Sequence, residues 1–184
     1  AILGMEASRV IAGCAEAATS FGPGSTEVVG AVNFDDPIQP VIAGTKAGVD
    51  KACELLKAAG AKRALPLPVS APFHSSLMKP AAEKLRMALS DVVLAVPQIP
   101  VLNNVDVAVQ QDVDAIRDAL YRQAFGAVRW VECVQALKGR GITHIIECGP
   151  GKVLAGLTKR IDPELVGAAL FDPATLAETR ELLA

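Results

Sequence analysis

The sequence predicts an α/β protein, in which short apolar strands alternate with amphipathic helices. Apolar runs of strand length, such as residues 28–34 and 142–147, are separated by stretches whose apolar residues recur at helical spacing, such as residues 6–18. Hydrophobic residues make up 51% of the 184 and charged residues 21%, so there is enough apolar surface to bury a core. This composition excludes a chain that is intrinsically disordered throughout.

The first 68 residues show the element order β-α-β-β-α-β. Thr45 is a candidate N-cap for the second helix and Gly60 a candidate left-handed stop, while a turn composition, DDP from Asp35, joins the middle strands. This order is typical of a ferredoxin-like fold, so we expect a small subdomain over residues 1–68. The expected strands cover residues 1–4, 28–34, 40–44 and 62–67, and the expected helices cover residues 6–18 and 45–59.

A proline-rich segment, LPLPVSAPFHSSLMKP from Leu65 to Pro80, separates this unit from the rest of the chain. Its four prolines lack backbone donors and disfavour a helix, which predicts a loop or a crossover. Strands then alternate with helices again, which predicts a second part over residues 69–184 with a parallel, helix-covered sheet. The expected helices there cover residues 81–90, 114–125, 131–138, 153–160 and 173–183, and the expected strands 101–102, 142–147 and 166–170.

Charge and cysteine content exclude several classes of protein. A net charge of -2 gives no basic surface for reading phosphates, which argues against a nucleic-acid binder. No apolar run reaches about 18 residues and no basic-then-apolar leader is present, so we expect no membrane span or signal peptide, and a soluble, cytoplasmic protein. The four cysteines form no C-x-x-C pair, so we expect buried thiols and no metal site.

His74 is the leading candidate for chemistry, because a proline-stiffened loop holds its side chain in place and leaves it reachable. An imidazole, with an ordinary pKa of about 6.5, can take a proton from a hydroxyl or thiol and return it within one cycle. The alternative is a merely exposed loop histidine. His144, which precedes an apolar run, is expected to start a strand.

Other polar motifs are less specific. ECGPGKVLAGL, from Glu147, places glycines at a strand-to-helix turn, but its spacing does not match a phosphate-binding P-loop, which leaves a tight crossover or a ligand-facing loop. Asn33 and Gln39 flank the DDP turn and offer amide groups to a polar substrate, although turns also attract asparagine for local reasons. No G-x-S-x-G nucleophile elbow is present in the sequence.

Five segments together resemble malonyl-CoA:acyl carrier protein transacylases. They are VNFDDPIQPVIAG from Val32, AKRALPLPVSAPFHSSLMKPAAEKL from Ala61, PVLNNVD from Pro100, AIRDALYRQAFGAVRWVECVQAL from Ala115 and ECGPGKVLAGLTKRI from Glu147. The match is to the family's C-terminal portion, which implies a ferredoxin-like small subdomain followed by the C-terminal part of an α/β-hydrolase-like acyltransferase subdomain with a parallel sheet.

The resemblance implies an acyltransferase of fatty acid biosynthesis. In the family a serine takes the malonyl group from coenzyme A and the phosphopantetheine thiol of acyl carrier protein collects it, with no metal and no cofactor beyond the thioester substrate. The family's catalytic histidine falls on His74, and the residue whose backbone carbonyl orients it falls on Gln123. Phe73 matches an aromatic residue that accompanies malonyl preference, and Asn33 and Gln39 match polar positions near the site.

The departures from the family are informative. Asp35 replaces the second asparagine of an N-F-N motif, and we expect it to face solvent. The serine, the oxyanion hole and the arginine for the malonyl carboxylate belong to the family's N-terminal half. We therefore expect that N-terminal portion to be a required partner, besides malonyl-CoA and acyl carrier protein, and the 184-residue chain alone to be inactive.

Two alternatives remain open from the sequence. The chain fits a non-catalytic module that binds acyl carrier protein or a ligand, since Lys79, Lys152, Lys159 and Arg160 offer a basic face to an acidic carrier. It also fits a fragment of the acyltransferase domain of a polyketide synthase. A binding module would give His74 no reason to combine a stiff loop with a titratable side chain.

Overall fold

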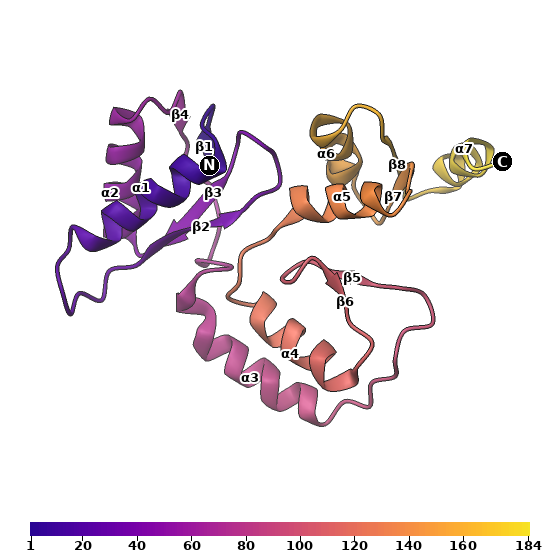
Figure 1. Ribbon diagram of the computed structural model, residues 1–184, viewed down its shortest axis with the longest axis horizontal. Coiled ribbons are helices and arrows are strands. Elements are labelled where there is room, and N and C mark those ends of the chain that lie inside the picture. Colours follow the sequence, from indigo (N-terminus) through magenta and orange to yellow (C-terminus); the bar gives the residue numbers. More distant parts are fainter. The chain divides into compact units, whose positions relative to one another are not determined.

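The computed structural model describes residues 1–184. The chain forms two compact units, residues 1–130 and residues 131–184, and each is described by itself. None of its helices combines the length and the apolar character that crossing a membrane requires. The predicted α/β class is confirmed, with small sheets and helices that alternate along the chain (Figure 1).

The first unit begins with the predicted β-α-β-β-α-β order. Its two strand pairs, β4–β1 and β3–β2, are antiparallel. The backbone N–H groups of Ile2 and Gly4 donate to the carbonyls of Pro40 and Ile38 at 2.9 Å, so β1 lies beside the residues that lead into β3. The strands therefore follow the order β4-β1-β3-β2 of a ferredoxin-like sheet. The elements are β1 (Ile2–Leu3), α1 (Ala7–Thr19), β2 (Val29–Asn33), β3 (Val41–Gly44), α2 (Lys46–Ala58) and β4 (Arg63–Ala64).

Local signals in the sequence explain these elements. The Thr45 hydroxyl accepts the N–H of Gly48 at 3.3 Å and caps α2, as predicted, and Gly60 follows the helix with φ +101°. The apolar faces of α1 and α2 meet the strands in one core. Its buried members are Ile2, Met5, Val10, Cys14, Ala17, Ile42, Ala52 and Leu56.

The rest of the first unit is a pair of helices and a short hairpin. Residues 65–75 contain no regular element, as predicted, but α3 (Lys79–Ser90) begins before Pro80, because proline is tolerated in the first helical turn. The prediction that the whole segment to Pro80 is non-helical is therefore wrong at its end. A 3₁₀ turn (Ser76–Met78) leads into α3, and α4 (Val113–Gln123) follows the hairpin of β5 (Leu102–Asn103) and β6 (Ala108–Val109), of which β6 was not predicted.

Helices α3 and α4 pack side by side and antiparallel (Figure 1). The hydroxyl of Tyr121, near the end of α4, donates to Glu83, near the start of α3, at 2.6 Å. Arg117, about one turn earlier in α4, donates to the carbonyl of Leu89 at the end of α3 at 3.3 Å. The start of α3 therefore lies beside the end of α4.

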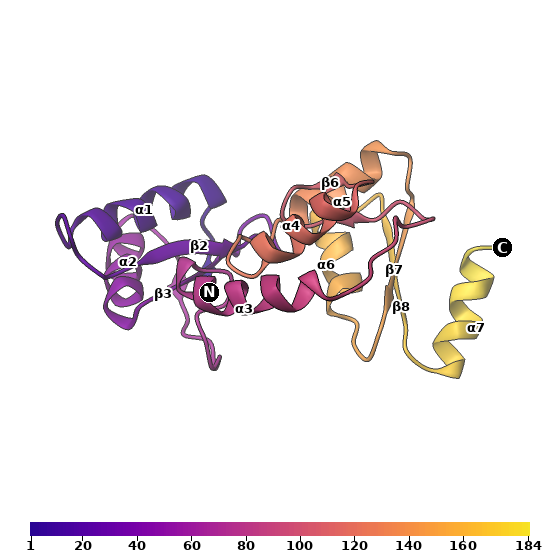
Figure 2. The same ribbon diagram turned by 90° about the horizontal axis from the view of Figure 1, so that it is seen from below.

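The second unit is a parallel β-α-β element with flanking helices. Strand β7 (His144–Cys148) pairs with β8 (Val166–Leu170) in parallel, and the two run side by side in Figure 2. Helix α6 (Val153–Ile161) connects them, as the predicted parallel sheet requires. Helices α5 (Trp130–Gly139) and α7 (Pro173–Leu182) precede and follow this element, and His144 begins β7, as predicted.

The prediction of four buried thiols is wrong at Cys148, which is exposed. Cys148 ends β7, whose sheet has two strands, so nothing pairs with the second edge of β7. Cys14 and Cys133 are buried, and Cys53 is half-buried. Burial, and to a smaller extent the charge of a Cys53 thiolate, raises the pKa of Cys14 to about 11.

This difference predicts selective thiol chemistry. In the folded chain a disulfide-exchange reagent at pH 8 is expected to modify Cys148 quickly and Cys14 slowly, as followed by intact-mass spectrometry. Because the folded-state pKa of Cys14 lies above its ordinary value of 9.0, the thiolate favours the unfolded state and stability falls as the pH rises from 9.0 to about 11. Cys14→Ala should remove that fall, and equal labelling of Cys14 and Cys148 would contradict the burial.

Candidate active site

The backbone of His74 is strained. It has φ +62°, in the left-handed region that residues with a side chain rarely adopt. Such a conformation costs on the order of 1 kcal/mol and persists only where neighbouring contacts enforce it. Ser75 supplies those contacts, since its N–H and its hydroxyl both bind the carbonyl of Pro72, at 3.2 and 2.7 Å. Strain of this kind is concentrated at functional sites.

One hydrogen bond defines the orientation of the His74 ring. Nδ1 lies 3.1 Å from the backbone carbonyl oxygen of Gln123. A carbonyl only accepts, so Nδ1 must carry the proton of the neutral ring. The other nitrogen, Nε2, is then the basic one, and it can take a proton from a substrate or from a nucleophile.

The end of α4 presents the Gln123 carbonyl to His74. The N–H of Gly126 turns back to the carbonyl of Arg122 at 2.7 Å, and the N–H of Ala124 bonds to the carbonyl of Tyr121 at 3.3 Å. These bonds satisfy two orphan carbonyls of the last helical turn, and the carbonyl of Gln123 accepts from His74 instead. Because α3 and α4 are antiparallel, the loop before α3 reaches this end of α4.

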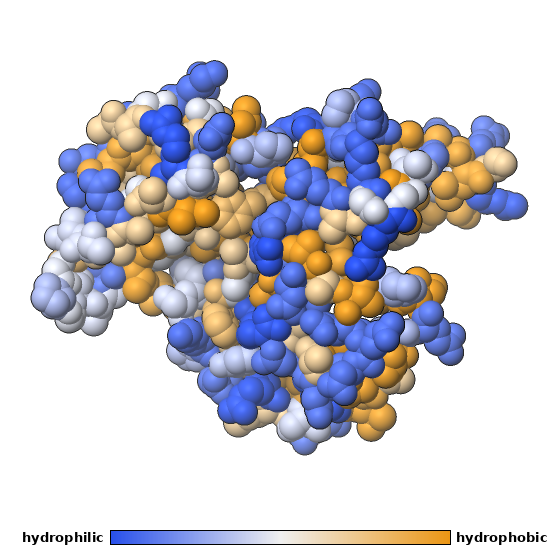
Figure 3. Space-filling view, viewed as in Figure 1, coloured by the Kyte–Doolittle hydropathy of each residue, from blue (hydrophilic) through white to orange (hydrophobic).

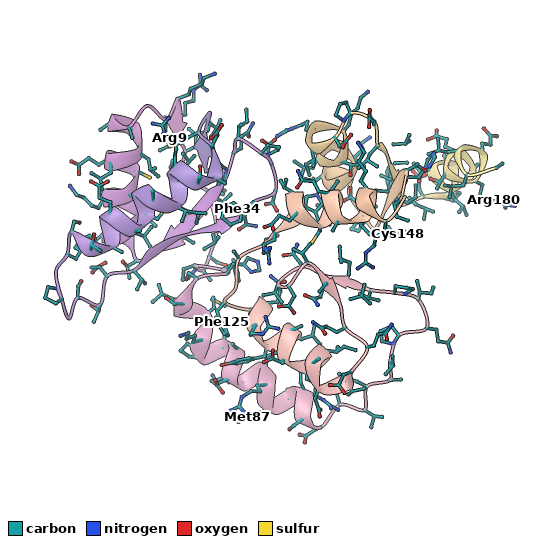
Figure 4. The ribbon with its side chains drawn as sticks, viewed as in Figure 1. Arg9, Phe34, Met87, Phe125, Cys148 and Arg180 are labelled. Carbon is teal, nitrogen blue, oxygen red and sulfur yellow. The ribbon has the colours of Figure 1, made fainter.

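His74 lines a cavity of about 330 Å³. One wall consists of His74, Ser75, Ser76, Phe125 and Ala127, and the other of residues from α1, β2 and β3. Phe125, labelled in Figure 4, follows α4. Its ring lies 5.7 Å from the ammonium of Lys79 at the start of α3. The wall formed by residues 28–32, in β2 and directly before it, is largely apolar. The cavity can therefore hold a small acyl group beside a titratable imidazole.

The predicted substrate-binding residues lie on segments near this cavity but do not line it. Asn33 ends β2 and donates from Nδ2 to a carboxylate oxygen of Asp35 at 3.1 Å. Gln39 is half-buried, and its backbone N–H lies 3.5 Å from the carbonyl of Asp36. Phe73 is 48% exposed and directly precedes His74. The structure thus joins His74 to Gln123 and leaves Asn33, Gln39 and Phe73 outside that hydrogen-bonded pair.

Asp35, which was expected to face solvent, is half-buried. The reason is local pairing: Phe34 donates its N–H to the carbonyl of Val128, and Val128 donates to the carbonyl of Val32, both at 2.8 Å. Burial raises the pKa of the Asp35 carboxyl, while the Asn33 hydrogen bond and the positive charge of a protonated His74 lower it. A carboxyl group therefore lies within electrostatic range of the candidate base.

The glycine-rich turn after β7 is structural. A carboxylate oxygen of Glu147 accepts the N–H of Ala155 at 2.9 Å, in the first turn of α6. The chain's own carboxylate therefore occupies the helix N-terminus that an anionic ligand would need. Sequence reasoning missed a different feature, the ion pair between Asp106 and Arg122 beside Gln123, because nothing in the spacing of these residues predicts the β5–β6 hairpin. In residues 1–184, no group of three or more His, Cys, Asp or Glu residues is placed to hold a metal ion.

Solved structures define the class of fold. The chain matches a crystal structure of an acyl-carrier-protein S-malonyltransferase from Burkholderia pseudomallei with a TM-score of 0.91 and 63% sequence identity, over 98% of this chain and 57% of the other. A malonyl-transacylase solved in complex with a type II PKS acyl-carrier protein matches with a TM-score of 0.91, 46% identity and the same coverage. The chain therefore has the fold of the C-terminal part of an α/β acyltransferase.

Curated relatives name the family. The malonyl CoA-acyl carrier protein transacylase of Escherichia coli K12 is 48% identical over 182 residues, which are 99% of this chain and 57% of the relative. That of Haemophilus influenzae is 47% identical over 183 residues, with 100% and 57% coverage. A scan against protein-family models gives no match. The chain belongs to the malonyl CoA-acyl carrier protein transacylases, and it spans a little over half the length of these relatives.

The strain at His74 predicts how the stability of the chain depends on the residue at this position. His74→Gly and His74→Ala both lose the bond to Gln123, but only glycine adopts φ +62° without cost. We expect His74→Gly to be more stable than His74→Ala by about 1 kcal/mol in urea unfolding. Equal or lower stability of His74→Gly would show that the strain does not exceed the extra unfolded-state entropy of glycine.

Proposed function

We propose that this chain supplies the general base and part of the acyl pocket of a malonyl-CoA:acyl carrier protein malonyltransferase in fatty acid biosynthesis. The observation that carries the proposal is the contact of His74 Nδ1 with the Gln123 carbonyl, 3.1 Å, on a ring that lines a cavity. The names of the relatives support the substrate class, and the complex of one malonyl-transacylase with an acyl-carrier protein supports the partner.

In the proposed reaction His74 moves one proton in each direction in each half of the cycle. Nε2 takes the proton of a serine hydroxyl as the oxygen attacks the malonyl thioester, and returns it to the sulfur of coenzyme A as the C–S bond breaks. In the second half Nε2 takes the proton of the carrier's phosphopantetheine thiol as its sulfur attacks the acyl-serine. It then returns that proton to the serine oxygen. No metal takes part in these steps.

The Gln123 carbonyl suits this double role. It fixes the tautomer with Nε2 unprotonated, and it lies at the negative end of α4, where the helix dipole favours a positive charge. A neutral acceptor stabilises the imidazolium less than an aspartate would, so the ring returns its proton readily.

The serine must come from an N-terminal portion like that of the relatives, and exposed apolar surface supports such a partner. Val93 is 96% exposed and Ile99 78%, and apolar side chains reach the surface at many places in Figure 3. We take the exposed segment that holds Val93 and Ile99 as a surface that the missing polypeptide covers, since contiguous apolar surface marks such contacts. We place this partner, malonyl-CoA and acyl carrier protein together in the cytoplasm.

For specificity we propose that Phe73, beside His74, narrows the acyl site against branched groups, and that Asn33 and Gln39 contact the polar end of the substrate. We also propose that the small subdomain ends at residue 68 and that residues 69–184 belong to the larger one. The segment 65–75, which has no regular element, then acts as the crossover that carries His74.

The function is tested with a fusion in which the residues of the Escherichia coli relative that precede its match are placed before Ala1. The 184-residue chain alone should not form an acyl-enzyme, whereas the fusion should transfer radiolabelled malonyl groups from malonyl-CoA to holo acyl carrier protein. His74→Ala in the fusion should slow transfer by about 10²- to 10⁴-fold, the usual contribution of general acid–base catalysis.

His144→Ala is the matched control, because His144 begins β7 outside the site and bonds to the hydroxyl of Thr143. It should leave the transfer rate unchanged. Undiminished transfer by the His74→Ala fusion would remove His74 from the mechanism. Carrier binding without transfer by the folded wild-type fusion would favour the binding module instead.

A further inference from the structure

An ion pair ties the last turn of α4 to the β5–β6 hairpin. Nη1 and Nη2 of Arg122 donate to the two carboxylate oxygens of Asp106 at 2.6 and 2.9 Å. Nε of Arg122 donates to Asp118, one turn earlier in α4, at 2.6 Å. The side chains of Arg122 and Asp106 are 35% and 23% exposed. This bidentate geometry fixes the orientation of the Arg122 guanidinium as well as its distance from the Asp106 carboxylate.

The hairpin side of the pair is well held. The N–H of Asp106 donates to the side-chain oxygen of Asn103 at 2.9 Å, and Asn103 donates from Nδ2 to the carbonyl of Ala108 at 2.9 Å. The amide of Gln110 donates to Asp106 at 3.3 Å. Hydrogen bonds to Arg122 lower the pKa of Asp106, so its carboxyl stays ionised at neutral pH. The carboxylate is therefore a fixed anchor.

The same hairpin also holds the chain beyond α4. The side-chain oxygen of Asn104 accepts the N–H of Arg129 at 2.8 Å. Residues 122–129 are thus attached to the hairpin at both ends, and Gln123 lies inside this span, directly after Arg122. Helix ends fray unless they are held, and the carbonyl that orients His74 lies in the last turn of α4.

We propose that the Asp106–Arg122 pair positions the Gln123 carbonyl and, through it, the Nδ1–H tautomer of His74. Asp106 and Arg122 are positioning residues, since neither lines the cavity next to His74. The inference rests on the proposed function for its effect on rate, but its effect on the ring can be observed without turnover.

The test uses the complete fusion with ¹⁵N-labelled histidine, carrying Asp106→Asn or Arg122→Lys. Each variant has a side chain of similar length but cannot form the bidentate ion pair. The ¹⁵N shifts of the neutral His74 ring should report Nδ1–H in the wild type and a shift toward Nε2–H in both variants. The kcat of malonyl transfer should fall by roughly 10- to 100-fold, the range found for residues that orient metal-binding histidines, with KM for malonyl-CoA changed less than about twofold.

The pair of Lys138 with Asp162 is the matched control, because its side chains are 37% and 19% exposed and its N–O distance is 2.6 Å. Asp162→Asn should also lower stability, but it should leave the His74 tautomer and the kcat at their wild-type values. Asp106→Glu, which restores the charge, should recover part of the rate and of the Nδ1–H signal.

The proposal is overturned if the His74 tautomer in Asp106→Asn and Arg122→Lys matches the wild type, or if Asp162→Asn shifts it equally. If the fusion transfers no malonyl group but the two variants still shift the tautomer, the proposed function fails and the positioning role stands. Circular dichroism of Arg122→Lys, the milder change, confirms that the variant compared is folded.

Discussion

The site depends on one hydrogen bond, from His74 Nδ1 to the backbone carbonyl of Gln123. A side-chain acceptor can rotate away, whereas a backbone carbonyl moves only if the helix end moves. The bond therefore fixes the ring of His74, a loop residue, relative to the end of α4. It also offsets part of the cost of the left-handed backbone at His74, which would otherwise relax toward an ordinary conformation.

The packing of α3 against α4 makes that bond possible. A helix has unsatisfied carbonyls only in its last turn, so a histidine that uses one must approach the C-terminal end of the helix. The antiparallel arrangement, held by Tyr121 with Glu83 and by Arg117 with Leu89, brings the residues before α3 to that end of α4. His74 and Gln123, which are 49 positions apart in the sequence, are therefore in direct contact.

The sequence predicts the elements of this protein better than their contacts. Caps and periodicity identify α1, α2 and the β-α-β element around α6, because these signals act within a few residues. A strand was expected at residues 101–102, but its hairpin partner β6 was missed, since two residues are too few for an alternating pattern. The partial burial of Asp35 was not predicted, because residues 32–34 pair with Val128 beside it, a contact that no local pattern encodes. The link between His74 and Gln123 was available only from resemblance, since a backbone carbonyl has no sequence signature.

The His74 ring is oriented by a neutral group, the Gln123 carbonyl, although the carboxyl of Asp35 lies nearby. A carboxylate bound directly to Nδ1 would hold the imidazolium more firmly than a carbonyl does. Asp35 is close enough to sense the charge of His74, yet Asn33 binds one of its oxygens and its partly buried position disfavours its ionised form. The Gln123 carbonyl therefore sets the direction of the ring, while burial raises the pKa of the Asp35 carboxyl more than the charge of His74 lowers it. In the proposed reaction the ring must release its proton twice in each cycle, and an acceptor that fixes its direction without a full negative charge suits that role.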